Sequence, residues 1–328
     1  MILFWTAMLV LATLLYVLLD GFDLGVGILF GLTRRQDHRR QMLSAISPVW
    51  DGNETWLVLA GTILFACFPR VYATLLSAFY LPITLMLGAL ILRGVAFEFR
   101  YKATWSRPLW DWGFFGGSLI ATFIQGLTVG ALARGLPMSG GQYDGGPFGW
   151  FSPFACLCGV GLCLGYMMLG AGWLIAKCEG RLRDEAYRQL PKLSLGVFGF
   201  LVLAYVSALV QQLRIMDRWI ERPYLAAFPV IGVVAGAVLI LGARRRLDLA
   251  PILATAVIFA AAFATLAASF WPYMIPFAIT IDDGAAPPES LGFMFWGAGL
   301  IVMPLILTYT VTVYRVFRGK IIDYAAHE

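Results

Sequence analysis

The sequence predicts an all-α protein, a polytopic transmembrane helical bundle of about nine helices that forms a single domain over residues 1–328. First, 60% of the residues are hydrophobic and only 13% are charged, whereas soluble chains carry about a quarter charged residues. Second, the mean hydropathy is +0.79, so apolar residues dominate the chain. Third, apolar runs alternate with short loops along the whole length, and no loop is long enough to form a second, soluble domain.

Nine apolar segments approach or exceed the length of about 20 residues that a bilayer-spanning helix requires. They cover residues 2–31, 47–67, 72–98, 112–134, 151–177, 192–213, 223–242, 250–273 and 291–315. The first segment lacks the basic start of a signal peptide and exceeds its usual apolar length of about 7–15 residues, so we interpret it as a retained helix. The loops contain Pro, Gly and charged residues, which favour helix ends.

The basic residues of the loops predict the orientation of the bundle. The loops after the first, third, fifth and seventh segments, together with the C-terminal segment, hold 18 Lys and Arg residues, against five on the other side. Cytoplasmic loops of membrane proteins are enriched in these residues, so we expect the N-terminus outside and the C-terminus in the cytoplasm. Because the net charge of +5 is spread over short loops, it does not indicate nucleic-acid binding.

Four acidic residues stand in or at the edge of the first two segments. Asp20 and Asp23 lie in the run DGFDLGVG of the first segment, and Asp51 and Glu54 lie in WDGNETW at the start of the second. A charge in the membrane core costs about 2.5–3.5 kcal/mol on insertion scales, so it is rarely there for packing alone. Residues three apart share a helix face, and a short loop joins the two segments. We therefore expect a carboxylate cluster near one membrane face.

These acids allow several interpretations. Asp20 and Asp23 can be structural, bonded to backbone amides or paired with an arginine. They can line a proton path. They can also bind a cation, although no wider pattern of oxygen ligands is present. Asp51 and Glu54 can be ordinary acids of a first helical turn, or they can form the entrance to the proton path.

A buried positive charge is expected to pair with this cluster. Arg93 lies in an apolar run and should have a carboxylate partner, for which Asp20 or Asp23 would serve. Glu98 is a further candidate, but its spacing of five residues from Arg93 is not ideal for a pair on one helix.

Glycine and tryptophan mark contacts of the same segments. The stretches 21–25 and 27–31 begin and end with glycine, a spacing that lets helix backbones approach closely, within the chain or against another subunit. Trp50 and Trp56 fit the aromatic belt of a membrane interface.

Histidine is confined to His38, in a predicted loop, and His327, near the C-terminus. Haem iron usually takes an axial His, Cys, Met or Tyr, and no apolar segment contains a histidine. We therefore predict that this chain holds no b-type haem and no metal, with its methionines serving mainly in packing. The five cysteines lie in apolar runs or at their ends, where they are expected to behave as small hydrophobic residues.

Several motifs together resemble subunit II of the cytochrome bd-type quinol oxidases. The segments DGFDLGVG and WDGNETW are the specific ones. The resemblance continues through the stretches 93–100, 110–113, 152–154, 269–276 and 304–309, so it covers essentially the whole chain. The length and short loops resemble the compact members, which include the cyanide-insensitive oxidases.

The resemblance implies a complex of the bacterial cytoplasmic (inner) membrane that oxidises quinol and reduces O2 to water without pumping protons. In that family, subunit I carries two b-type haems, haem d and the quinol site, and subunit II is its haem-free, pseudo-symmetric mate. Small single-helix subunits commonly complete the complex, and some relatives hold a structural quinone in subunit II. For this chain the resemblance implies partnership with subunit I and membrane lipids, and none with nucleic acid.

Individual residues take roles from the resemblance only where the motifs match. Asp51 matches an aspartate proposed to lie on a hydrophilic proton route at the subunit interface. Trp56 matches a tryptophan near a proposed lateral access route for O2. Asp20 and Asp23 match the signature acids of the first helix. Two alternatives remain at this point: a proton- or cation-coupled secondary transporter, with Asp20, Asp23 and Asp51 as coupling acids, and a purely structural subunit.

Overall fold

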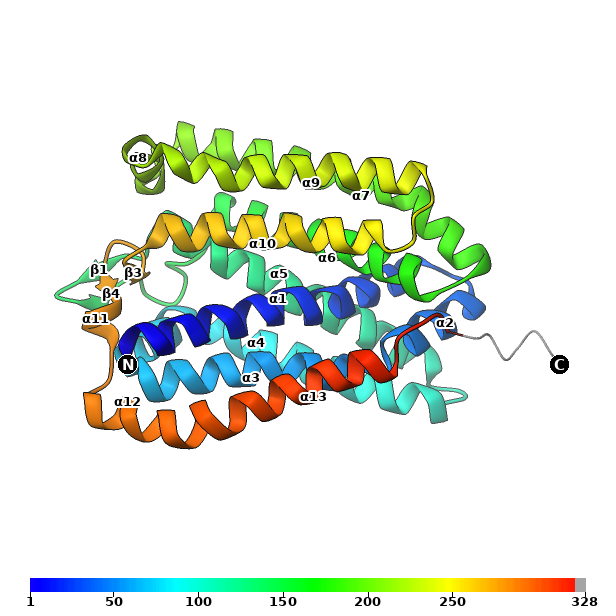
Figure 1. Ribbon diagram of the computed structural model, residues 1–328, viewed down its shortest axis with the longest axis horizontal. Helices are drawn as coiled ribbons and strands as arrows, with labels where there is room; N and C mark the ends of the chain where they lie inside the picture. The colour runs from blue at the N-terminus through cyan, green and yellow to red at the C-terminus, as the bar shows by residue number, and fades with distance from the viewer. Residues whose placement is uncertain (322–328) are drawn as a thin grey trace.

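The computed structural model describes residues 1–321, which form a bundle of long helices lying side by side (Figure 1). The helices are α1 (Ile2–Leu32), α2 (Gln36–Ile46), α3 (Trp50–Cys67), α4 (Pro69–Lys102), α5 (Arg107–Arg134), α6 (Pro153–Lys177), α7 (Gly180–Val210), α8 (Arg214–Glu221), the 3₁₀ turn η1 (Pro223–Ala226), α9 (Ala227–Arg244), α10 (Ala250–Phe270), α11 (Ile281–Gly284), α12 (Pro288–Met294), the π-helical η2 (Phe295–Val302) and α13 (Met303–Val316). Two small antiparallel hairpins pair β1 (Met138–Ser139) with β2 (Gln142–Tyr143) and β3 (Tyr273–Ile275) with β4 (Ile279–Thr280).

The predicted transmembrane bundle is confirmed. Within residues 1–321, eight helices are long and apolar enough to cross a membrane, with η1 and α9 counted as one and α12, η2 and α13 as another. The one predicted segment outside these eight, 47–67, corresponds to α3, which has 18 residues, carries Asp51 and Glu54 in its first turns, and packs along α1. Because α3 is short and its first turns carry Asp51, Asn53 and Glu54, it is not among these eight helices.

The connections contain more structure than the sequence suggested. The predicted basic loop after α1 holds the helix α2, so His38 is helical and buried rather than in a loop. Helix α7 starts at Gly180, twelve residues before the predicted boundary at residue 192. Its 31 residues span about 46 Å, which exceeds the apolar core of about 30 Å. The first turns of α7 therefore project beyond the membrane core.

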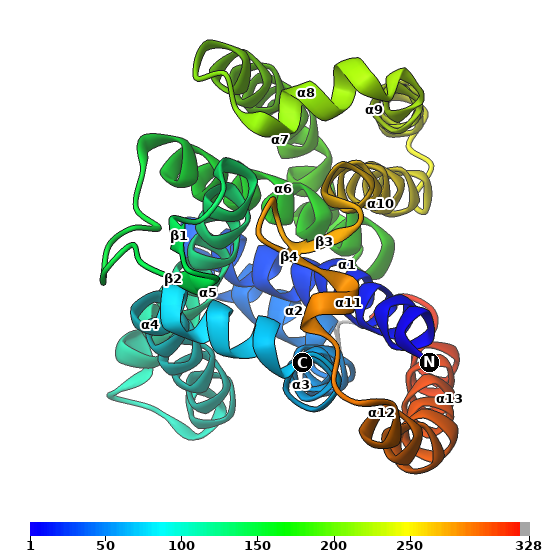
Figure 2. The same ribbon diagram turned by 90° about the vertical axis from the view of Figure 1, so that its left-hand side faces the viewer.

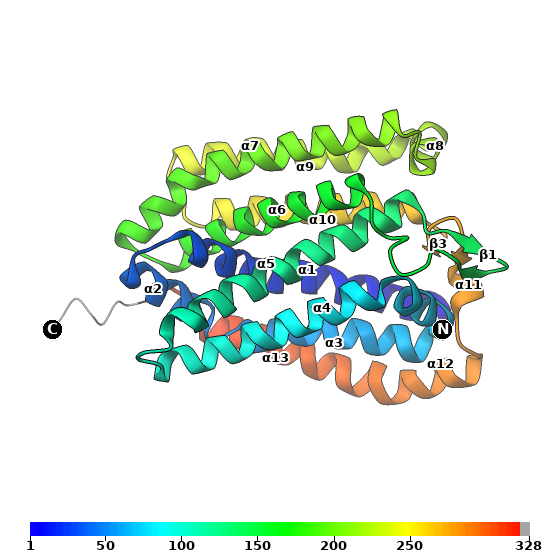
Figure 3. The same cartoon turned by 180° about the vertical axis from the view of Figure 1, so that it is seen from behind.

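The basic loops gather at one end of the bundle. Helix α2, the start of α7, the α9–α10 connection and the end of α13 all lie at the end opposite the N-terminus (Figure 1). The α4–α5 connection reaches the same end when the bundle is seen from behind (Figure 3). By the positive-inside rule this is the cytoplasmic end, and the N-terminus, α8 and both hairpins lie at the outer end.

Helix α1 is the central element. An end-on view places α1 between α6 and α10 on one side and α3 on the other, with α7, α8 and α9 at one edge and α12 and α13 at another (Figure 2). The α1 segment from Asp20 to Phe30 is buried throughout. The bundle thus holds the predicted acidic segment inside protein, away from lipid.

The glycines of α1 serve contacts within the chain. A Cβ atom added at Gly25 would lie 1.7 Å from the backbone oxygen of Tyr166 on α6, and one at Gly21 would lie 2.7 Å from the Tyr166 ring. A Cβ at Gly27 would lie 2.1 Å from Oγ of Ser118 on α5. The glycine spacing therefore lets α5 and α6 approach the acidic segment.

A methyl group at Gly25 is expected to separate α1 from α6. Gly25→Ala should destabilise the protein by at least the upper end of about 1–3 kcal/mol, because the atom that it meets is backbone and cannot rotate away. Gly61→Ala is the matched control, since a Cβ at Gly61 has no neighbour within 4 Å. Thermal unfolding of the purified complexes measures both variants, and equal unfolding temperatures would refute this description of the α1–α6 contact.

Candidate functional site: a buried carboxylate–arginine cluster

Two carboxylates of α1 and one guanidinium of α4 form the centre of the site. Asp20 and Asp23 are fully buried, and Arg93 is 1% exposed. Nη1 of Arg93 donates a hydrogen bond of 3.2 Å to Oδ1 of Asp20. Arg93 lies nine residues before the end of α4, about 14 Å inside the cytoplasmic end. The structure thus places Arg93 against one of the two partners that the sequence suggested.

The third carboxylate comes from α3. Oε2 of Glu54 lies 3.8 Å from the same Nη1 atom of Arg93, and the Glu54 side chain is 26% exposed, whereas Asp20 is fully buried. Glu54 therefore connects the buried pair with the outer surface of α3. Two carboxyl groups, those of Asp20 and Glu54, thus contact one arginine, and a third, that of Asp23, lies within electrostatic range of it. This excess of acids is the main electrostatic feature of the site.

Asn53 of α3 fixes the remaining acid of the cluster, Asp23, by a hydrogen bond. Nδ2 of Asn53 donates a hydrogen bond of 2.6 Å to Oδ2 of Asp23, and Oδ1 of Asn53 accepts one of 3.0 Å from the Tyr314 hydroxyl on α13. Asn53 is 1% exposed. The amide thus fixes the Asp23 carboxyl and links α1, α3 and α13 through one side chain. Sequence reasoning missed Asn53 and Tyr314, although an amide in an apolar helix was a visible signal.

Two further hydrogen bonds link Tyr16 of α1, through Gln125 of α5, to Tyr166 of α6. Nε2 of Gln125 on α5 donates to the Tyr16 hydroxyl at 2.7 Å, and the hydroxyl of Tyr166 donates to Oε1 of Gln125 at 3.1 Å. Tyr16 and Tyr166 are buried. Gln125 lies in the middle of an apolar run, so its position in the sequence was the signal that could have identified it.

Several buried polar atoms of the cluster have no hydrogen-bond partner within residues 1–321. They are Oδ2 of Asp20, Oδ1 of Asp23, and Nε and Nη2 of Arg93. Buried polar groups in folded proteins are nearly always hydrogen-bonded. One oxygen on each aspartate is therefore available to a proton or to a further polar group.

The other predicted site residues lie outside this centre. Asp51 is on the exposed face of α3, so three of the four predicted acids meet and the fourth faces outward. Glu98 is also exposed and forms no ion pair within residues 1–321, so the expectation that it pairs with Arg93 is wrong. Trp56 is fully buried, which corrects its assignment to an interfacial belt.

A separate ionic contact holds the cytoplasmic end together. Asp111 on α5 accepts a hydrogen bond of 2.7 Å from Arg39 on α2 and a very short one from Arg100 on α4. Both guanidinium groups lie over the ring of Phe30, at 5.0 and 5.2 Å from its centroid. Asp111 therefore ties α2 and α4 to α5, next to the end of α1, a structural role that sequence reasoning did not assign.

Other features of the described chain lie apart from the cluster. No group of three or more His, Cys, Asp or Glu residues within positions 1–321 has a geometry suited to a metal ion. His327 lies outside the described residues.

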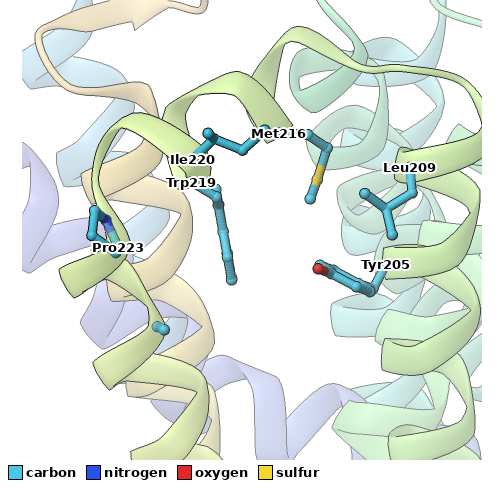
Figure 4. Close-up of a pocket in the computed structure, with 7 residues that line it drawn as sticks. Tyr205, Leu209, Met216, Trp219, Ile220 and Pro223 are labelled. Carbon is cyan, nitrogen blue, oxygen red and sulfur yellow. The ribbon is translucent and has the colours of Figure 1, made fainter.

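A cavity of about 280 Å³ opens at the outer end, where Tyr205 and Leu209 of α7 face Trp219 and Ile220 of α8 (Figure 4). Its lining is apolar and aromatic, and the expectation of a structural quinone stays a prediction.

The fold and the cluster define a polytopic helical membrane protein whose interior brings acidic side chains together around one arginine. The family described as "Cytochrome bd terminal oxidase subunit II" matches residues 1–317. The chain belongs to this family, which confirms the resemblance of its motifs. It is therefore a subunit of an oxidoreductase complex and a multi-pass protein of the bacterial inner membrane.

Individual relatives agree with this assignment. "Cytochrome bd-I ubiquinol oxidase subunit 2" of Escherichia coli (strain K12) is 31% identical over 347 residues, covering 93% of this chain and 91% of that protein. "Cytochrome bd ubiquinol oxidase subunit 2" of Bacillus subtilis (strain 168) is 31% identical over 321 residues, covering 93% and 92%. The solved structure of the bd oxidase from Geobacillus thermodenitrificans has the same fold, with a TM-score of 0.78 at 19% identity, covering 96% of this chain and 98% of that chain.

Membership of the family argues against one of the two interpretations left open by the sequence, the secondary transporter. It implies a complex with haems and a subunit I partner, and it removes the support for a secondary transporter. The alternative of a purely structural subunit II remains to be tested.

Proposed function

We propose that this chain is the haem-free subunit of a quinol-oxidising, O2-reducing complex, and that its acidic cluster delivers protons from the cytoplasm to the oxygen chemistry of subunit I. Relatives named as ubiquinol oxidases support the reaction class. In this assignment subunit I carries the b-type haems, haem d and the quinol site.

The haem-free assignment rests on the distribution of histidine. The sequence has only two histidines, His38 in the cytoplasmic helix α2 and His327 near the C-terminus. A b-type haem inside the membrane would need an axial ligand from an apolar helix, and the methionines there are more simply explained by packing. The function of this chain is then to shield the haems of subunit I from lipid and water, and to provide the acidic side chains that deliver protons.

The observation that carries the proton role is the charge balance around Arg93. In an apolar interior the carboxyl groups of Asp20 and Glu54 contact one guanidinium, and the Asp23 carboxyl lies within electrostatic range of it. Several uncompensated negative charges at this depth would be costly, so neutrality calls for protons bound within the cluster. Protons held this way can pass between the neighbouring carboxyl groups of the cluster.

A route through the chain follows from the exposure of the acids. Asp51 stands on the surface of α3 near its cytoplasmic start, Glu54 is partly exposed one turn deeper, and the Asp20–Arg93 pair is fully buried. We assign Asp51 as the entrance, Glu54 as the intermediate group, and Asp20 and Asp23 as the inner acids.

Trp56 belongs to the proposed role in O2 access. It is fully buried in an apolar cluster with Leu59 and Ile63 of the same helix. O2 is apolar and partitions into such surroundings, so this part of α3 would offer it a path from lipid toward subunit I.

Asp51→Asn tests the proton role against a purely structural one. Because Asp51 is exposed and forms no ion pair within residues 1–321, the variant should assemble with its haem spectrum intact. Quinol-dependent O2 consumption should fall about 100-fold, the low end of the effect of removing a proton-transferring group. Glu98→Gln, which removes another exposed acid near the cytoplasmic end, is the control and should retain full turnover.

The alternatives give different results for the same pair of variants. A structural role for Asp51 predicts that haem content and turnover fall together. Full turnover with full haem content in Asp51→Asn would refute the assignment of this residue to the proton entrance.

A further inference from the structure

A strongly basic cavity lies at the cytoplasmic end, remote from the carboxylate cluster. It has a volume of about 380 Å³ and lies between α2, the first turns of α7 and the connection after α9. All of its lining residues carry ionisable side chains, and they are Arg35, His38, Arg181, Asp184, Glu185, Arg188 and Arg246. Such a lining is unsuited to an apolar ligand and well suited to an anion.

The positive charge in this cavity exceeds the negative charge. Asp184 is engaged by Arg246 at 2.5 Å, and Arg35 is engaged by Asp37, just outside the cavity, at 2.8 Å. The guanidinium groups of Arg181 and Arg188 form no ion pair or hydrogen bond within residues 1–321. They stand seven residues apart on α7, which places them on one face of the helix.

A buried histidine supports the presence of a ligand. His38 is 3% exposed, and its Nδ1 atom lies 3.0 Å from Oε2 of Glu185. This carboxylate engages Nδ1, whereas Nε2 has no hydrogen-bond partner within residues 1–321. A buried polar side chain without such a partner is uncommon. Beside two unpaired arginines, Nε2 of His38 therefore calls for a polar partner.

We propose that this cavity binds the phosphate group of an anionic phospholipid of the cytoplasmic leaflet. Arginine forms paired hydrogen bonds with phosphate oxygens, and both free arginines lie in the part of α7 that projects from the membrane core on the cytoplasmic side. Basic pockets between helices on the cytoplasmic side are typical sites for anionic headgroups. A bound headgroup would join α2 to the projecting part of α7.

The test uses the assembled complex in nanodiscs that contain phosphatidylglycerol and phosphatidylcholine. Native mass spectrometry counts the phosphatidylglycerol molecules retained by the wild type and by Arg181→Gln/Arg188→Gln. The double variant should retain the bound lipid about 30-fold more weakly, because each basic residue near an anionic headgroup contributes about a factor of five. Arg244→Gln/Arg245→Gln removes two exposed arginines of the same end outside the cavity and should leave retention unchanged.

Two further sets of measurements complete the test. One shows whether a variant has lost lipid merely because it is unfolded, and the other identifies the source of the phosphate. The haem spectrum and thermal unfolding of each complex show whether the variant is assembled, and His38→Gln provides a second, milder change at the same cavity that should also weaken retention. Inorganic phosphate added to the wild-type complex should not displace the lipid. Displacement by inorganic phosphate would overturn the lipid assignment in favour of a soluble phosphate compound, and equal lipid retention by all variants would overturn the site itself.

Discussion

Arg93→Met is expected to prevent the complex from accumulating in the membrane. The substitution removes the only cation that contacts Asp20 and Glu54 within the described chain and leaves buried carboxylates uncompensated. Removing one partner of a buried ion pair typically costs about 3–5 kcal/mol, which is a large part of the stability of most domains. The amount of assembled complex, measured from its haem spectrum per membrane protein, reports the effect.

A second substitution distinguishes charge from shape at this position. Asp20→Asn/Arg93→Met removes both members of the closest pair and should restore much of the assembly, since replacing both partners of a buried pair is far less harmful than replacing one. Normal assembly of Arg93→Met alone would show that the pair does not balance charge in the bundle. No rescue in the double variant would show that the shape of Arg93 matters more than its charge.

Asp23→Asn is expected to have the opposite profile, with normal assembly and a large loss of turnover. An asparagine oxygen at this position can still accept the 2.6 Å hydrogen bond from Asn53, so the contact between α1 and α3 is kept. The variant also removes one acid from a cluster that has three acids and one arginine. If Asp23 transfers protons, O2 consumption should fall about 100-fold or more.

The measurement is quinol-dependent O2 consumption per haem in the purified complex. Asn53→Ala serves as the comparison, because it removes the hydrogen bond to Asp23 but leaves the carboxyl group in place. A small effect of Asn53→Ala beside a large effect of Asp23→Asn assigns the loss to the proton-binding group. Full turnover in Asp23→Asn would exclude that residue from the route.

The sequence predicted the helical bundle well because apolar length is a strong signal in membranes. It also placed Asp20 and Asp23 with a buried arginine, since a charge in an apolar run must find a partner. It could not show which acid would meet Arg93. The choice of Glu54 rather than Glu98 depends on how α3 and α4 are rotated about their axes, and this is set by packing that local sequence does not encode.

The missed residues have a common physical reason. Asn53, Gln125 and Tyr314 come from three helices far apart in the sequence, and only the packed bundle brings them to the acids or to Tyr16. Helix α2 was missed because its basic first turns are typical of a cytoplasmic loop. Its apolar residues become a packing face only when α6 and α1 are in place.

Time-resolved voltage across a liposome membrane tests the central claim most directly. The reduced complex is mixed with O2, and haem oxidation and the voltage from proton uptake are followed together in the wild type, Asp51→Asn and Asp23→Asn. The account predicts that electrons reach O2 at the normal rate while the proton-coupled voltage phase slows about 100-fold in both variants. A voltage phase of normal rate and amplitude in both variants would contradict the claim that the acids of this subunit supply the protons for oxygen reduction.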